Sequence, residues 1–240
     1  NLFTESGEDI VFKSRIGVVS LSNTYRFNDK AFLKTSFAVD VAANDIINDT
    51  LNSTNGSYNP YYRNNSYEGK QSINVVFNQK INARNLLKIG VYNQRKFFHL
   101  KDSIHQRSDS VLNPFTNSYV ALQPQWKKLT NYDGATYFIQ PFVQWQFRVN
   151  EDLTLNTGIH SQYFVYNSTF AVEPRLGIKY KSNDKSTFSA GYGLHNQLAP
   201  TRLFFREQTD LFGNTVFDDK GEAIIPNKEL KMVRSQHFVV

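Results

Sequence analysis

The side chains that could do chemistry in this sequence are charged and amide groups that alternate with apolar residues. Six of those on the polar face of segments 135–149 and 170–182 are Gln140, Gln144, Arg148, Glu173, Arg175 and Lys179. Successive side chains of a β-strand point to opposite faces, so each set lies on one face of a sheet. Such a face suits non-covalent binding of a charged solute or protein surface. Glu173 and Arg175, two positions apart, are expected to form an ion pair.

No arrangement of residues resembles a catalytic or metal site. The five histidines are His99, His105, His160, His195 and His237. They lack the HExxH spacing or any other ligand spacing, and neither a GxSxG elbow nor a phosphate-binding glycine loop occurs. The chain also has no cysteine, which excludes disulfides and thiolate metal sites. We therefore expect a protein that is not an enzyme and that uses no metal or cofactor.

Four short polar turns organise the segments that carry these residues. They occur in "RFNDKAFL", "KINARNLL", "RVNEDLTL" and "YKSNDKST", and their Asn, Asp and Ser residues suit tight hairpin geometry. The turns predict four antiparallel strand pairs, and a ninth strand begins near Lys231. The expected pairs are 14–27 with 31–44, 68–82 with 86–100, 135–149 with 153–165, and 170–182 with 186–197.

Composition agrees with strands that are apolar on one face only. The aromatic share is 15%, yet mean hydropathy is −0.48. No run of 18 apolar residues occurs, so no spanning helix is predicted, while strands of a membrane barrel give a much weaker signal. The net charge of +6 comes from scattered Lys and Arg, which argues against nucleic-acid binding. Residues 1–14 do not read as a signal peptide.

Long polar connections alternate with the short turns. The predicted loops are 45–67, 101–134 and 198–230, and a compact soluble domain seldom has several loops of this length. Outer-membrane barrels combine short periplasmic turns with long extracellular loops. The pattern therefore predicts an all-β fold of antiparallel transmembrane β-barrel strands, about nine of a larger barrel. Loop aromatics expected at the rim of an extracellular substrate site are Tyr58, Tyr61, Tyr62 and Trp126.

The polar residues of each strand would face the lumen of such a barrel, because an Arg or Lys that faces lipid at the midplane costs about 2–4 kcal/mol. Pro141 and Pro174 lie on the apolar face of their strands, about ten residues before the turns that follow. At about 3.3 Å per residue and a tilt near 40°, this is some 25 Å above the periplasmic rim. A proline removes a ladder hydrogen bond, so it is better tolerated there than at mid-membrane.

The stretch "AVEPRLGIKYKSNDKSTFSAGYGLHNQLAPTRLFF", residues 171–205, resembles the C-terminal half of TonB-dependent outer-membrane receptors. The matching motifs are Pro174-Arg175-Leu176-Gly177 and Ser189-Ala190-Gly191-Tyr192-Gly193. The continuation "GLHNQ", followed later by "NKEL" and "SQHF", is similar to the Bacteroidetes branch that carries an N-terminal carboxypeptidase-regulatory-like domain. The motifs cover about a third of the chain, and the rhythm of turns and loops covers nearly all of it.

The resemblance implies a 22-stranded barrel in the bacterial outer membrane, of which residues 1–240 are a partial barrel domain without the plug and the N-terminal domain. It implies active uptake of a scarce nutrient, such as a siderophore, glycan or peptide, with TonB acting through the plug. Outer-membrane lipid surrounds the barrel, and a surface lipoprotein or envelope-complex subunit is a further partner. Two alternatives remain open, a structural or assembly subunit without transport and a soluble β-sandwich binding module.

The suspected lineage also implies O-glycosylation. Thr50, Ser103 and Ser110 each lie in a short Asp-Ser/Thr-aliphatic acceptor pattern. All three fall in the loops assigned to the cell exterior. We expect glycans at these hydroxyls.

Overall fold

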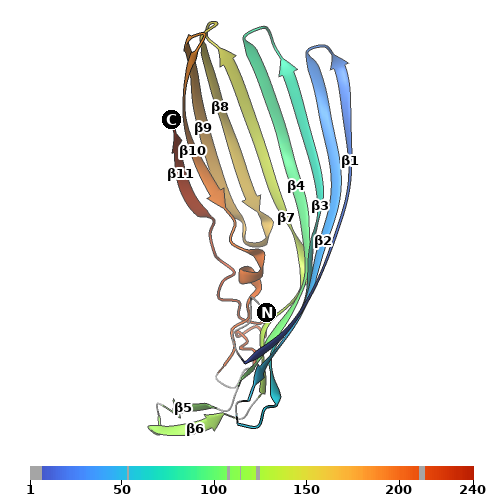
Figure 1. The fold of residues 1–240 in the computed structure, drawn as a ribbon, viewed down its shortest axis with the longest axis vertical. Helices are drawn as coiled ribbons and strands as arrows, with labels where there is room; N and C mark the ends of the chain where they lie inside the picture. Colours follow the sequence, from blue (N-terminus) through green and yellow to red (C-terminus); the bar gives the residue numbers. More distant parts are fainter. Residues whose placement is uncertain (1–6, 53, 107–108, 114, 123–124, 211–213) are drawn as a thin grey trace.

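The computed structural model describes residues 7–52, 54–106, 109–113, 115–122, 125–210 and 214–240. Nine strands form one antiparallel sheet in the order β1-β2-β3-β4-β7-β8-β9-β10-β11, and a separate hairpin, β5-β6, follows β4. Every neighbour in the large sheet is also the next sheet strand along the chain, as in an up-and-down barrel wall. The sheet is open and strongly curved, with the four short turns gathered at one end (Figure 1). The predicted all-β antiparallel architecture is confirmed.

The strands on the β1 side are longer than those on the β11 side (Figure 1). The strands of the sheet are β1 Glu8–Asn28, β2 Ala31–Leu51, β3 Tyr58–Lys80, β4 Asn85–Gln106, β7 Gln125–Arg148, β8 Leu153–Phe164, β9 Thr169–Asn183, β10 Ser186–Gln197 and β11 Val233–Val239. The hairpin and the two 3-10 turns are β5 Asp109–Asn113, β6 Ser118–Leu122, η1 Val165–Asn167 and η2 Thr201–Phe205.

All four predicted hairpin turns are present, and each is closed by an asparagine side chain. The Oδ1 atom of Asn28 accepts a hydrogen bond from Lys30 N at 2.8 Å, and that of Asn183 accepts one from Lys185 N at 2.9 Å. Asn82 and Asn150 each accept hydrogen bonds from two backbone N–H groups of their turns. These local bonds satisfy backbone donors that no strand can pair, which explains why the same residue type recurs.

Two of the three predicted long loops are wrong. Most of 45–67 continues β2 and β3, and much of 101–134 belongs to β4, β7 and the β5-β6 hairpin. Their polar residues pair across strands: Arg63 forms an ion pair with Asp49 at 2.7 Å, and His99 stacks on Tyr67 with 5.0 Å between ring centroids. Polarity identified these segments as solvated, but polar strands pair their backbones as well as apolar ones do. Among its described residues, the segment 198–230 contains only η2 and short bridges.

The two faces of the sheet differ in chemistry. The face that carries Gln144 and Glu173, here called the concave face, is polar over much of its area. On the opposite, convex face, large apolar side chains are exposed over β1 to β4 and β7 to β9. They include Leu21, Phe37, Ile73, Ile89, Val143, Trp145, Ile159, Leu176, Ile178 and Tyr180. In the part of the chain that the structure describes, no helix is long and apolar enough to cross a membrane.

The best-buried apolar cluster lies between the sheet and the segment 198–232. This segment leaves β10, folds back along the concave face and returns as β11 (Figure 1). Phe204 and Phe205 of η2 are 0% and 1% exposed. They pack against aromatic and aliphatic side chains of β4, β7 and β8. The sheet residues of the cluster are Phe98, Leu100, Phe138 and Phe164.

Candidate functional site: the concave face

The six polar residues predicted to share a face lie on the concave face. Strand pairing places Gln144 opposite Lys88 and Gly158, and places Gly158 opposite Arg175. Arg148 pairs with Thr154, which pairs in turn with Lys179. Gln140 lies opposite Tyr92. These side chains share one face because the alternation in β7 and β9 runs without a bulge through this region, and their contact with a lumen stays a prediction.

Glu173 is the most deeply buried charged residue among those described. It is 1% exposed, and its carboxylate accepts hydrogen bonds from His160 Nδ1 at 2.8 Å, Gln162 Nε2 at 2.6 Å and the Asn196 backbone N–H at 2.5 Å. Arg175 Nη2 lies 2.8 Å from the same carboxylate, so the expected ion pair is present. A buried charge is tolerated when it is paired and fully hydrogen-bonded. Glu173 thereby fixes side chains of β8, β9 and β10 relative to one another.

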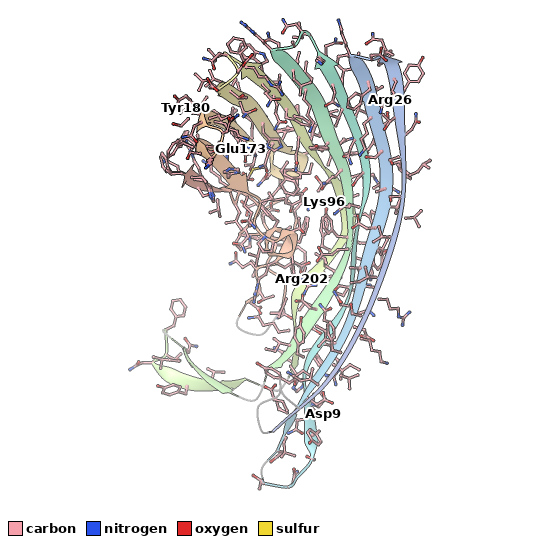
Figure 2. The ribbon with its side chains drawn as sticks, turned by 45° about the horizontal axis from the view of Figure 1, so that its top comes forward. Asp9, Arg26, Lys96, Glu173, Tyr180 and Arg202 are labelled. Atoms are coloured by element: carbon pink, nitrogen blue, oxygen red, sulfur yellow. The ribbon has the colours of Figure 1, made fainter. Side chains whose placement is uncertain are left out.

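The segment 198–232 is held to the concave face by polar contacts as well as by its phenylalanines. Arg202 Nη2 donates to Ser66 Oγ at 3.1 Å, and Thr201 Oγ1 donates to Glu68 at 3.3 Å. At the other end of the segment, Asn167 Nδ2 donates to the carbonyl of Leu230 at 2.9 Å. Figure 2 shows Arg202, Lys96 and Glu173 on the concave side of the ribbon. The segment therefore covers part of the concave face near the end away from the short turns.

The four rim candidates lie in strands rather than in loops. Tyr58, Tyr61 and Tyr62 belong to β3, and Trp126 belongs to β7. Tyr62 donates to Asp102 at 3.4 Å. The indole of Trp126 lies under an arginine guanidinium of β3, with 5.4 Å from the guanidinium carbon to the ring centroid. They sit toward the end of the sheet opposite the short turns, where the prediction put them, although their role at a substrate rim stays a prediction.

The three glycosylation candidates also lie in strands. Thr50 is in β2, Ser103 in β4 and Ser110 in β5. The sequence pattern placed them in loops because the surrounding residues are polar. Their position toward the end of the sheet away from the short turns is unchanged, and their modification stays a prediction.

Sequence reasoning missed the aromatic residues of the concave face. Phe138 and Phe142 share the parity of Gln140 and Gln144, and both are buried. Their signal is the break in alternation in "YFIQPFVQ", where phenylalanine takes a polar position. Phe204 and Phe205 were missed because they lie in a predicted loop, but two adjacent phenylalanines in a polar connection are themselves a sign of docking.

Among the described residues, no group of three or more His, Cys, Asp or Glu residues is arranged to hold a metal ion. The concave face instead offers cations, amides and aromatic rings on a rigid sheet. A single curved antiparallel sheet that is apolar on its convex face and polar on its concave face has the two-sided chemistry of a membrane β-barrel wall.

The chain belongs to the TonB-dependent receptor-like β-barrel family, whose model matches residues 4–238. This membership places it in the bacterial outer membrane. Two solved structures of similar fold are a "RagAB peptide importer" in a "closed-closed" state and a "RagAB peptide transporter". Each has a TM-score of 0.56 and 10% identity; 98% and 96% of this chain is covered, and 28% of the solved chain in both cases. No curated protein matches the chain in sequence.

Proposed function

We propose that this chain is part of the barrel wall of an outer-membrane transporter that takes up a scarce nutrient with energy delivered through TonB. The family match over nearly the whole chain carries this proposal. The two faces of the sheet support it, since a wall of this kind has lipid on its apolar side and an aqueous lumen on its polar side. The convex face thus contacts lipid, and the concave face lines the lumen.

The remaining elements take their roles from this orientation. The four short turns lie on the periplasmic side, and the β5-β6 end lies outside the cell. Residues 1–240 form part of the barrel domain of a longer protein, whose plug region contacts TonB. A surface lipoprotein is the expected protein partner at the outer rim. The solute is a peptide, glycan or siderophore, and the likeness to a peptide importer supports the first of these.

The test is growth on limiting nutrients. The gene of the parent protein is deleted in one strain, and the TonB gene in another, and each strain grows on a panel of scarce peptides, glycans and iron sources. We expect at least one nutrient for which both deletions slow growth and the double deletion adds nothing. A panel on which the parent deletion has no effect, or an effect that persists unchanged without TonB, would contradict active transport.

An assembly role without transport is the alternative outcome of the same work. Stoichiometric purification with an envelope complex, together with a phenotype independent of TonB, would favour it. The soluble β-sandwich alternative is wrong, because the nine long strands form one continuous sheet rather than two packed sheets and the chain belongs to a membrane-barrel family.

A further inference from the structure

A cavity of about 540 Å³ lies in the concave face over β4, β7, β8 and β9. Its volume is within the range of about 300–1,000 Å³ usual for small-molecule sites. Polar and aromatic side chains dominate its wall, and no acidic residue is among the described residues that line it. The side chains that matter here are Lys88, Tyr92, Phe142, Gln144, His160 and Arg175.

A pair of stacked rings forms one side of the cavity. Tyr92 and Phe142 have ring centroids 5.1 Å apart at an interplanar angle of 27°. Phe142 lies flat over Gly90, where an added Cβ would come within 2.7 Å of the ring. Lys88 Nζ lies 5.6 Å from the centroid of the Phe142 ring. A side chain at position 90 would displace the ring, so glycine there shapes an apolar platform with a cation beside it.

The opposite side of the cavity carries Arg175 and His160, and Glu173 holds both side chains in place. Glu173 holds Arg175 Nη2 and His160 Nδ1, each at 2.8 Å. The Arg175 Nε atom is buried, and no described residue is its hydrogen-bond partner. A buried unpaired donor is costly unless something accepts its proton. The guanidinium is therefore held in place by Glu173, and because the side chain is 40% exposed, its remaining N–H donors are available to a ligand.

The two cations stand at opposite ends of one row across the sheet. Lys88 pairs with Gln144, Gln144 with Gly158, and Gly158 with Arg175. Strands lie about 4.8 Å apart, so the backbones of Lys88 and Arg175 are about 14 Å apart. The glycine at position 158 makes room for the Gln144 side chain, since an added Cβ would lie 3.2 Å from Gln144 Cγ. Both basic side chains line the cavity, together with the amide of Gln144 between them.

We propose that this cavity binds a solute that carries carboxylates, held between Lys88 and Arg175. Gln144 and the neighbouring amides bind its other polar groups, and the Phe142–Tyr92 pair contacts its apolar edge. The inference rests on the proposed transport function and deepens it by naming an acidic solute. Both an acidic saccharide and an acidic peptide supply this chemistry.

The test measures binding to the full-length parent protein in detergent by isothermal titration calorimetry. The probes are digalacturonate and the peptide Ala-Glu-Ala, compared with lactose and with Ala-Gln-Ala amide. We expect one acidic probe to bind while its neutral counterpart does not, and to bind more weakly at high salt, because surface charges are screened. Which acidic probe binds distinguishes the saccharide from the peptide.

Variants connect the binding to the cavity. Lys88→Gln and Arg175→Gln should each weaken it about tenfold, the usual cost of one charge-assisted hydrogen bond. Lys34→Gln is the matched control, since Lys34 is a lysine of the same face outside the cavity. Gly177→Phe should abolish binding without misfolding, because the nearest atom to an added Cβ there is 3.8 Å away. Heat-modifiable gel mobility checks the fold of every variant.

Several results would overturn the proposal. They are no binding of either acidic probe, equal binding of the neutral probes, an equal loss with Lys34→Gln, or full binding by Gly177→Phe. None of these results bears on the growth test. If uptake depended on TonB but no acidic probe bound, the proposed transport function would stand and the proposed binding site would be wrong.

Discussion

The attachment of the segment 198–232 to the barrel wall is the feature whose energetics can be predicted best. Two kinds of contact hold η2, the aromatic pair Phe204 and Phe205 and the polar side chain of Arg202. A buried phenylalanine replaced by alanine typically costs about 3–5 kcal/mol. The Arg202–Glu68 pair has N and O 3.8 Å apart with both side chains more than a third exposed. Such pairs contribute about 1 kcal/mol or less.

The perturbation is therefore Phe204→Ala, compared with Arg202→Ala in the full-length protein. At about 1.4 kcal/mol per factor of ten, the loss of Phe204 should raise the opening equilibrium of the segment at least about 100-fold. The loss of Arg202 removes this ion pair and the hydrogen bond to Ser66, about 1–2 kcal/mol together, and should raise the opening equilibrium only about 5- to 30-fold. Hydrogen exchange of peptides from 198–232 measures this, because local opening separates the bridge between Arg206 of the segment and Thr130 of β7 and exposes backbone N–H groups to exchange.

Leu203→Ala is the control, since Leu203 lies between the two tested positions and is 42% exposed. It should leave exchange of the segment nearly unchanged. The reasoning would be refuted if Arg202→Ala released the segment more than Phe204→Ala did. It would also fail if Leu203→Ala matched Phe204→Ala, because burial would then not determine the attachment.

Three further predictions concern the faces, the titration and the modification of the protein. Single cysteines at Ile178 and Lys179, in native membranes, should react with a lipid-soluble and a water-soluble thiol reagent respectively; the reverse pattern would invert the barrel. Burial raises the pKa of Tyr166 to about 12, helped by Tyr132 and Glu229. The neutral phenol is favoured in the fold, so its contribution to stability is complete below pH 10 and is lost as pH rises toward 12; ultraviolet titration should show one late phenolate that Tyr166→Phe removes. Mass spectrometry of intact peptides from native protein should find glycans on Thr50, Ser103 or Ser110, and bare hydroxyls at all three would dispose of that prediction.

The sequence was sufficient for the strand pairing because local chemistry determines it. Asn28, Asn82, Asn150 and Asn183 each close a turn with their own side chains, and the alternation beside them assigns residues to faces. A one-residue slip would exchange the faces of a whole strand. The turn residue and the alternation therefore reinforce one another, and no distant contact is needed to predict the pairing.

The loop ends and the docked segment were not predictable in the same way, because both depend on distant residues. Nothing near Arg63 reveals that it pairs with Asp49 and stacks on Trp126, contacts that extend strands through polar sequence. Likewise, "PTRLFF" reads as a loop until Phe98 and Phe164 provide a surface for it. Period-2 alternation reports which face a residue takes, but it does not report what covers that face.

The docked segment and the carboxylate cavity lie one after the other along the same wall. On β7, Phe138 belongs to the cluster that holds the segment. Phe142, four residues closer to the short turn, belongs to the cavity. On β4, Phe98 and Lys88 have the same order. In the proposed transporter, a solute entering from the β5-β6 end would pass the segment before it reached the two cations. Because Glu173 fixes Arg175 independently of the aromatic cluster, release of the segment should widen access to the cavity while leaving its carboxylate-binding groups in place.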